Sequence, residues 1–228
     1  MNVVIIVAAG KGARMGVDKL WLEVDGTPIL GHTWRALDTI AEIDQIIIAA
    51  RDERHQAIDQ LAGEIQVSKP YELVLGGAER QDSVWNGLEA CPESCEIVAI
   101  HDAARPCVHP DMVRDCLKEA HRYGAVVVGR KITDTIKRAD DSQSIESTVD
   151  REGLWAAQTP QVFRLNLIRK AVERVRLAKK VFTDDTAACE YAGIPVKIVP
   201  SDYPNPKVTY PDDLPYVSWL LANQSRGV

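Results

Sequence analysis

The chain alternates short apolar runs with longer stretches in which apolar residues recur every three or four positions. Near-continuous runs of β-branched residues are typical of strands that are covered on both faces, as in a parallel sheet. The pattern therefore predicts one buried strand at each run. These runs occupy residues 3–8, 46–50, 72–75, 96–100, 125–129 and 196–199.

Helical spacing predicts helices over residues 28–40, 82–91 and 110–124. Pro28 suits a first helical turn, and either Asp82 or Ser83 is a good N-cap for the second helix. Strands that alternate with helices imply right-handed βαβ crossovers. We therefore expect an α/β fold, a doubly wound three-layer sandwich.

Residues 131–153 interrupt this alternation. They read as two short strands of mixed polarity joined by a solvated turn at 138–144. Such a hairpin is too polar for the core. We expect a single domain over residues 1–228, with residues 131–153 projecting from it as an arm.

Composition and charge exclude several classes of protein. The 228 residues carry a net charge of −6, which argues against a nucleic-acid surface, and no apolar run reaches the ~18 residues of a membrane span. The chain passes from Met1 almost directly into its first strand, so we expect no signal peptide. The five cysteines form no CxxC pair, which favours a reducing cytoplasm.

The first strand leads into a glycine-rich segment, "AGKGARMG", residues 9–16. Its spacing, GxGxxxG, is neither a P-loop nor the dinucleotide-binding fingerprint. Glycines let backbone N–H groups approach a phosphate, and Lys11, Arg14 and Lys19 supply a charge that suits a triphosphate. A tight turn with surface cations explains the segment equally well.

Two later strands also end in candidate site segments, at the edge where open α/β sheets bind ligands. Gly76 and Gly77 permit close approach to a base or ribose, or simply form a strand-to-helix turn. Asp102, in "HDAARP", is placed to hold Mg²⁺ bridging phosphates. Arg105 is either a phosphate clamp or a structural partner of Asp102.

Several further polar residues lie between apolar segments. Thr183 reads as the N-cap of a helix, and Lys207 by itself reads as a solvated lysine before the last helix. The remaining candidates are Thr135, Arg151 and Thr159.

Taken together, "VAAGKGARMGVDK", "GGAERQDSV", "HDAARP", "DTIKR", "TVDREGLWAAQTPQVF", "TDDTAACEYAG" and "KVTYPDDL" resemble the 2-C-methyl-D-erythritol 4-phosphate cytidylyltransferase family of the non-mevalonate isoprenoid pathway. The matches run in order over nearly the whole chain. The resemblance implies a Rossmann-like nucleotidyltransferase domain whose protruding β-arm joins two subunits in a homodimer. It implies transfer of CMP from CTP to 2-C-methyl-D-erythritol 4-phosphate, with Mg²⁺ as cofactor.

The resemblance also implies a role for each matching residue. Arg14 and Lys19 stabilise the transition state, and Asp102 holds the metal. The triphosphate loop comprises Ala8, Ala9, Gly10, Gly12, Arg14 and Lys19. The cytosine and ribose contacts are Gly76, Gly77 and Ser83. The erythritol-phosphate side comprises Arg105, Thr135, Arg151, Thr159, Thr183 and Lys207, of which Arg151 and Lys207 are also catalytic.

The sequence departs from the family pattern at three positions: Val7 and Asp18 each stand where proline is common, and Ala78 stands where aspartate often follows the glycines. Ala78 removes one possible hydrogen bond to ribose or base. One alternative is a cytidylyltransferase for another polyol phosphate, such as ribitol 5-phosphate. The other is a non-catalytic or redox nucleotide-binding protein, which the GxGxxxG spacing disfavours.

Overall fold

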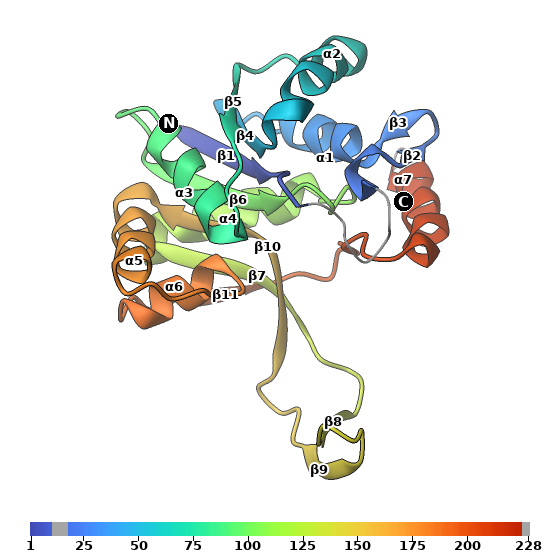
Figure 1. Ribbon diagram of the computed structural model, residues 1–228, viewed down its shortest axis with the longest axis vertical. Helices are drawn as coiled ribbons and strands as arrows, with labels where there is room; N and C mark the ends of the chain where they lie inside the picture. Colours follow the sequence, from blue (N-terminus) through green and yellow to red (C-terminus); the bar gives the residue numbers. More distant parts are fainter. Residues whose placement is uncertain (11–17, 225–228) are drawn as a thin grey trace.

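A seven-stranded sheet forms the centre of the protein, in the order β11-β7-β10-β6-β1-β4-β5 (Figure 1). The structure is a computed structural model and describes residues 1–10 and 18–224. All six expected strands are present. The sheet comprises β1 (Asn2–Val7), β4 (Gln45–Ala50), β5 (Tyr71–Leu75), β6 (Ile97–Asp102), β7 (Ala125–Lys131), β10 (Trp155–Arg164) and β11 (Lys197–Pro200).

Strand β10 makes the sheet mixed rather than parallel. It pairs antiparallel with both β6 and β7, whereas β1 pairs parallel with β4 and β6, and β11 pairs parallel with β7. The expectation of a mainly parallel sheet thus overlooked one central strand. Polar residues and Pro160 interrupt the apolar run of β10, although residues 159–163 are buried.

Helices cover both faces of the sheet, which confirms the three-layer sandwich. Alternate residues of β1 divide between the faces: Val4 and Ile6 pack with one helical layer, and Val3 and Ile5 pack with the other. The first layer comprises α1 (Ile29–Asp38), α2 (His55–Ile65), α4 (Pro110–Tyr123) and α7 (Leu214–Gln224). The second comprises α3 (Arg80–Ala90), α5 (Leu165–Leu177) and α6 (Asp185–Tyr191).

The starts of two helices differ from the prediction. Helix α3 begins two residues earlier, with Glu79 as N-cap and Asp82 completing a capping box from the third helical position. Helix α6 is capped by Asp184, whose side chain accepts a hydrogen bond from the Ala187 N–H, and not by Thr183. A carboxylate is the stronger acceptor at a helix N-terminus, where it also meets the positive end of the helix dipole.

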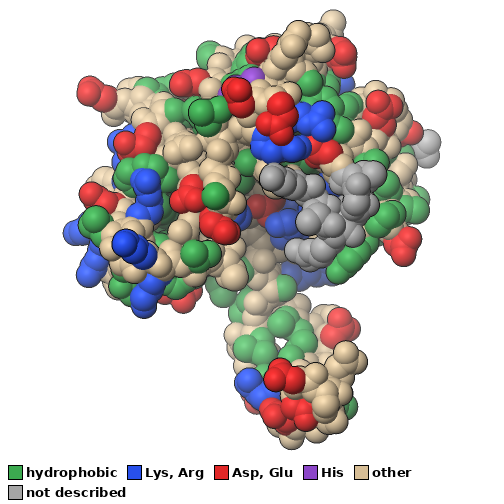
Figure 2. Space-filling model, viewed as in Figure 1, with side chains coloured by type: hydrophobic (Ala, Val, Ile, Leu, Met, Phe, Trp, Pro, Cys, Tyr) green, Lys and Arg blue, Asp and Glu red, His purple; other side chains and the backbone are tan. Residues whose placement is uncertain are grey.

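The projecting hairpin is confirmed. Strands β8 (Ile136–Ala139) and β9 (Ile145–Val149) pair with each other and form a small sheet of their own. Figure 1 shows this pair at the end of two extended segments that continue β7 and β10 away from the body. In the space-filling view the arm stands clear of the body, with charged side chains at its tip (Figure 2).

Two short 3-10 helices and a two-stranded ribbon complete the part that bears on the site. Helix η2 (Lys19–Trp21) precedes the ribbon formed by β2 (Glu23–Val24) and β3 (Thr27–Pro28), and η4 (Pro211–Asp213) precedes α7. A further 3-10 helix, η3 (Asp52–Arg54), precedes α2. Across residues 1–10 and 18–224, no helix has the length and apolar character that crossing a membrane requires.

Candidate active site

Asp102 is the last residue of β6, and it faces a pocket at the carboxyl ends of the parallel strands. The pocket has a volume of about 180 Å³. Segments that follow β1, β5 and β6 supply most of its wall, because the carboxyl ends of parallel strands meet at one edge of the sheet. Of the predicted site residues, the pocket brings together Ala9, Gly10, Lys19, Gly77, Ser83, Asp102 and Lys207.

The Asp102 carboxylate is buried among cations. Lys207 Nζ donates to Oδ2 at 2.7 Å, and Arg80 Nε donates to Oδ1 at 3.3 Å. Burial by itself would raise the pKa of this carboxyl, but the cations around it hold the pKa well below its usual value. Asp102 is therefore ionised throughout the neutral range.

Arg105 lies behind Asp102 rather than in front of it. Its Nε is 3.7 Å from Asp102 Oδ2, and its Nη1 donates to the Asn205 carbonyl at 2.7 Å. Asn205 Nδ2 in turn donates to the Thr159 carbonyl at 2.8 Å. Arg105 thus links the β6 loop to the segment before Lys207, as the structural interpretation of "HDAARP" expected.

Lys19 comes from the other side of the pocket. Its Nζ donates to the Val208 carbonyl at 2.8 Å, beside Lys207. The preceding residue, Asp18, forms ion pairs with Arg51 and Arg54. These contacts fix the residue before Lys19 to the start of α2 and its ammonium group to the C-terminal segment.

Close packing requires glycine at both positions 76 and 77, against the neighbouring strand ends at Gly76 and within the turn at Gly77. A Cβ at Gly76 would lie 2.2 Å from Ala9 Cβ, and one at Gly77 would lie 2.1 Å from Asp82 Cβ. Ser83 Oγ accepts a hydrogen bond from the Gly77 N–H at 3.0 Å, so this side chain organises the turn. The strand-to-helix interpretation therefore accounts for both glycines in the protein without ligand.

Thr159 is buried on β10, and its Oγ1 accepts a hydrogen bond from the Asp102 N–H at 3.0 Å. It supports the carboxylate from the neighbouring strand. Thr183 is exposed in the connection between α5 and α6. Neither residue lines the pocket.

Thr135 and Arg151 lie on the arm. Both are exposed, and neither lines the pocket of its own chain. An Arg151 guanidinium nitrogen donates to the Thr133 carbonyl, which holds the side chain against the base of the hairpin. Gly12 and Arg14 fall outside the described residues, and Ala8 is buried at the end of β1.

Sequence analysis missed Arg80, which lies in the pocket wall. It opens α3 and joins two buried carboxylates: Asp102, as above, and Asp185, whose Oδ1 accepts from Arg80 Nη1 at 2.9 Å. Arg80 stands inside the quoted segment "GGAERQDSV". A cation directly after a glycine turn was a signal that could have identified it.

The residues present fit a metal ion held jointly with substrate phosphates. Among the described residues, no group of three or more His, Cys, Asp or Glu side chains forms a metal cluster. Mg²⁺ commonly binds through one or two carboxylates plus phosphate oxygens, so a cluster is not required. Asp102 meets that need, because it is ionised and lines the pocket.

The arrangement favours binding of a polyphosphate over acid–base chemistry. Arg80, Lys19 and Lys207 all line the pocket. The nearest histidine, His101, is fully buried, and its Nε2 lies 3.2 Å from the Arg105 carbonyl, so it does not face the pocket. The site can neutralise and orient anionic groups.

Comparison with known proteins identifies a family for this constellation. The family model described as "IspD: 2-C-methyl-D-erythritol 4-phosphate cytidylyltransferase" matches residues 2–223. A protein of that name from Alkaliphilus metalliredigens is 40% identical over 98% of this chain and 94% of its own length. Another from Caldanaerobacter subterraneus is 42% identical, over 94% of this chain and 96% of its own.

The fold agrees with a solved structure as well. The crystal structure of 4-diphosphocytidyl-2C-methyl-D-erythritol synthase from Anaerococcus prevotii matches with a TM-score of 0.86 at 28% identity. The match covers 97% of this chain and 98% of that one.

Proposed function

The chain belongs to the 2-C-methyl-D-erythritol 4-phosphate cytidylyltransferase family, and on that basis we propose how its pocket performs the family's reaction. The enzyme transfers CMP from CTP to 2-C-methyl-D-erythritol 4-phosphate. The products are 4-diphosphocytidyl-2-C-methyl-D-erythritol and pyrophosphate, in the non-mevalonate route to isoprenoid precursors. The observation that carries the proposal is the cation-lined pocket at Asp102, where the segments of all three nucleotide motifs meet.

CTP occupies the side of the pocket formed by β1 and β5. Its triphosphate lies along residues 8–10 and is held by Gly12, Arg14 and Lys19, while cytosine and ribose lie against the turn of Gly76 and Gly77. The open backbone at Gly10 supports this placement, since no atom of residues 1–10 or 18–224 lies within 4 Å of a Cβ built there. Ser83 contributes to nucleotide binding by holding the Gly77 N–H in place through a hydrogen bond to its Oγ, in addition to its own contact with the nucleotide.

Asp102 holds Mg²⁺ together with the phosphates of CTP. When bound, the ion neutralises charge on the reacting phosphates as a Lewis acid. Removing metal with EDTA should abolish pyrophosphate release, and adding Mg²⁺ should restore it. Asp102→Asn keeps the side-chain shape but removes the charge, so it should raise the Mg²⁺ requirement sharply. Full activity of Asp102→Asn at low Mg²⁺ would contradict this assignment.

The second substrate binds on the side of Lys207, with Arg105, Thr159 and Thr183 as its further contacts; of these four residues, Lys207 alone lines the pocket of the protein without ligand. Lys207 lies within reach of both Asp102 and the pocket, which suits a cation that moves from a carboxylate to a substrate phosphate. Thr135 and Arg151 of the partner subunit complete this side in a homodimer. Their place on an arm that leaves its own body supports that arrangement.

The 4-phosphate attacks the α-phosphorus of CTP in line, and pyrophosphate leaves. A phosphate monoester has a second pKa near 6, so it is mostly dianionic at neutral pH and needs no protein base. The chain's own contribution is therefore to orient two anions and to stabilise the charge that moves to the leaving pyrophosphate. Lys19 and Arg14 serve the leaving group, and Lys207 and the partner subunit's Arg151 orient the attacking phosphate.

A crossed panel tests the whole assignment. Pyrophosphate release is measured with CTP, UTP, ATP and GTP against 2-C-methyl-D-erythritol 4-phosphate and ribitol 5-phosphate. The proposal expects release with CTP and the erythritol phosphate. The comparison of the four nucleotides is informative because Ala78, an exposed residue that lines the pocket, offers no side-chain hydrogen bond to ribose or base. Preference for ribitol 5-phosphate would favour a cytidylyltransferase for that polyol phosphate. If no substrate combination released pyrophosphate, a nucleotide-binding protein without this activity would be favoured.

We place the enzyme in the cytoplasm. All five cysteines are buried, and their thiols are free rather than joined in disulfides. Unpaired buried thiols are typical of proteins kept in a reducing compartment.

A further inference from the structure

Asp185 is a buried carboxylate for which the proposed reaction has no use. It lies in the first turn of α6 and is 3% exposed. Its Oδ1 accepts a hydrogen bond from Arg80 Nη1 at 2.9 Å, and its Oδ2 lies 2.9 Å from Arg80 Nη2 without the geometry of a directed hydrogen bond. A buried charge is tolerated only where it is paired, so Asp185 and Arg80 depend on each other.

This pairing fixes the direction in which Arg80 points. A guanidinium is planar, and holding its two terminal nitrogens on one carboxylate determines where its Nε lies. Here Nε faces Asp102 Oδ1 at 3.3 Å. A single arginine thus joins the buried carboxylate to the predicted metal ligand.

The same region joins the two halves of the site. Arg80 follows the glycine turn on the nucleotide side, and Asp185 follows Thr183 on the other side. The next residue, Gln81, donates from Nε2 to the Lys180 carbonyl at 2.9 Å and accepts from the Phe182 N–H at 3.2 Å.

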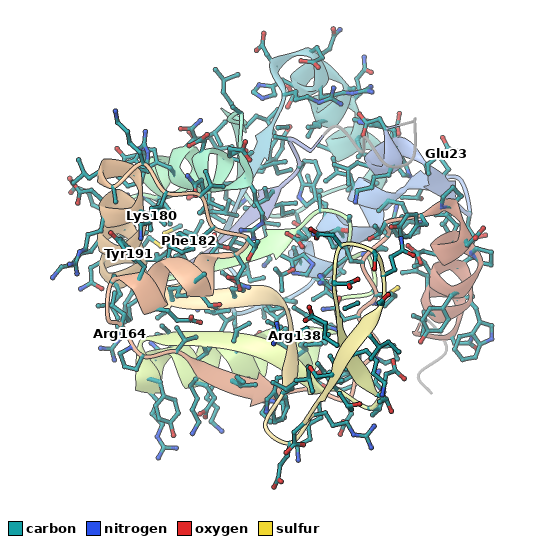
Figure 3. All side chains as sticks on the ribbon, turned by 60° about the horizontal axis from the view of Figure 1, so that its bottom comes forward. Glu23, Arg138, Arg164, Lys180, Phe182 and Tyr191 are labelled. Atoms are coloured by element: carbon teal, nitrogen blue, oxygen red, sulfur yellow. The ribbon has the colours of Figure 1, made fainter. Side chains whose placement is uncertain are left out.

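Side chains hold this connection in place as well. Figure 3 shows Lys180 and Phe182 gathered with Tyr191 at α6. The Phe182 and Tyr191 rings are 5.7 Å apart, and Lys180 Nζ lies 4.5 Å from the Tyr191 ring centroid. The chain that leads to Asp185 is therefore packed against α6 and hydrogen-bonded to α3, which keeps the carboxylate at a fixed place relative to Arg80.

Charge balance gives Asp185 its importance. Three cations surround Asp102: Arg80 and Arg105 at its flanks, and Lys207 in the pocket. Asp185 offsets the charge of Arg80 at its two terminal nitrogens, whereas Asp102 meets its Nε. Without it, the full charge of Arg80 would bear on Asp102 and would oppose a divalent cation there.

We propose that Asp185 is a positioning residue that acts through Arg80 to keep Asp102 able to bind a divalent cation. The inference rests on the proposed role of Asp102 in metal binding. Asp185 touches neither substrate nor metal. Its contribution is to orient the Arg80 guanidinium and to neutralise its charge.

The test measures Mn²⁺ binding directly, by electron paramagnetic resonance, with the whole enzyme and a CTP analogue that carries a methylene between the α- and β-phosphorus atoms. Asp185→Asn should raise the Mn²⁺ dissociation constant by roughly tenfold or more, because a buried compensating charge is lost. In turnover, the variant should need more Mg²⁺ for half-maximal activity, and saturating Mg²⁺ should restore most of kcat. A merely structural defect would lower kcat at every Mg²⁺ concentration.

Asp184→Asn is the matched control. It removes the same charge one residue earlier, and asparagine still caps the helix. The Asp184 side chain contacts Gln161, Thr186 and the Ala187 N–H rather than Arg80. Mn²⁺ binding by this variant should equal that of the unmodified enzyme.

A double variant, Asp185→Asn with Arg80→Gln, separates charge from folding. It removes both buried charges, so Mn²⁺ should bind more tightly than to Asp185→Asn alone, and thermal unfolding verifies that it is folded. If the double variant bound Mn²⁺ no more tightly than Asp185→Asn, or if Asp185→Asn bound it as tightly as the unmodified enzyme, the inference would be overturned. Asp102→Asn distinguishes failure of this inference from failure of the proposed function. If Mn²⁺ binding survives that change, the proposed metal-binding role of Asp102 itself is wrong.

Discussion

The ammonium group of Lys19 donates to a neutral carbonyl, that of Val208, at 2.8 Å. Exchanging such a contact for an anionic phosphate oxygen is favourable, since hydrogen bonds between two charged groups are the stronger ones. We expect Lys19→Ala to lower kcat by about 10²-fold or more, the range seen when an electrostatic stabiliser is lost. Arg14→Ala should behave alike.

The measurement for Lys19 is pyrophosphate release at saturating CTP. Lys118→Ala removes an exposed lysine from α4, outside the pocket lining, and should leave kcat unchanged. Equal melting temperatures for both variants would show that the fold persists. Normal turnover by Lys19→Ala would remove this residue from the transition-state role.

His101 makes the stability of the fold depend on pH. It is fully buried on β6, and its Nδ1 has no hydrogen-bond partner among the described residues. Burial lowers its pKa to about 4, so between that value and the ordinary value near 6.5 the unfolded chain binds a proton that the folded chain does not. The folded state is therefore fully favoured by this group above pH 6.5 and loses stability as the pH falls toward 4.

At pH 5 the loss from His101 amounts to about 2 kcal/mol relative to neutral pH. Urea unfolding at pH 5 and pH 7.5 measures it. In His101→Gln, which cannot titrate, that part of the pH dependence should disappear even though the variant is less stable overall. An unchanged slope between the two pH values would show that His101 is not its source.

Gly77 and Gly10 distinguish a glycine that the fold requires from a glycine that ligand binding requires. At Gly77, which joins β5 to α3, a Cβ would lie 2.1 Å from Asp82 Cβ, so Gly77→Ala should destabilise the free enzyme. At Gly10, beyond β1, a Cβ would meet no atom within 4 Å in the part of the chain that the structure describes. We expect Gly10→Ala to keep the melting temperature but to raise KM for CTP, because the triphosphate then meets a methyl group.

Thermal unfolding and CTP saturation curves distinguish the two glycine variants. If Gly10→Ala changed neither quantity, the triphosphate would not pass close to this residue. If Gly77→Ala kept the melting temperature, the turn would have more freedom than its packing indicates.

Regular apolar patterns predicted most of the strands and several of the helices, and a strand with an interrupted pattern was missed. The six apolar runs and the polar arm were found. Strand β10 was missed because Pro160 and polar neighbours break its pattern, and its burial comes from β6 and β7, which flank it. Helices α2 and α5 were not predicted, although their buried apolar residues recur at helical spacing: Ile58, Leu61 and Ile65 in α2, and Leu165, Ile168, Val172 and Val175 in α5.

The same contrast holds within the site. Glycine turns and strand-end carboxylates are visible as local motifs, so Gly77 and Asp102 could be placed. The partnership of Arg80 with Asp185 joins residues 105 positions apart and depends on the packing of α6 against α3 and β10. A local sequence pattern cannot predict an ion pair between residues so far apart in the chain.

At the scale of the whole molecule, the arm separates two predicted substrate-binding residues from the pocket that needs them. In the proposed two-fold dimer each arm would reach the other subunit, and the symmetry makes the two contacts equivalent. Lys19→Ala and Arg151→Ala should each be inactive alone. Mixed through unfolding and reassociation, they form heterodimers in which one site has both residues intact.

Random mixing makes half of the dimers heterodimers with one good site in two, so activity should recover to roughly a quarter of the unmodified level. Refolding each variant alone provides the control, and both should stay inactive. A mixture that also stays inactive would show that each arm serves its own chain.

Strand β10 leads from Trp155 at the base of the arm to Thr159, which supports the backbone of Asp102, and its pairing with β7 shifts register once, between Ala157 and Gln161. Side chains alternate along a strand, so gaining or losing one residue between these points would turn every later side chain to the opposite face. The turn at residues 140–144 carries no such constraint, since it is exposed and joins only β8 to β9. Insertions and deletions should therefore be tolerated at the tip of the arm and rejected along its base.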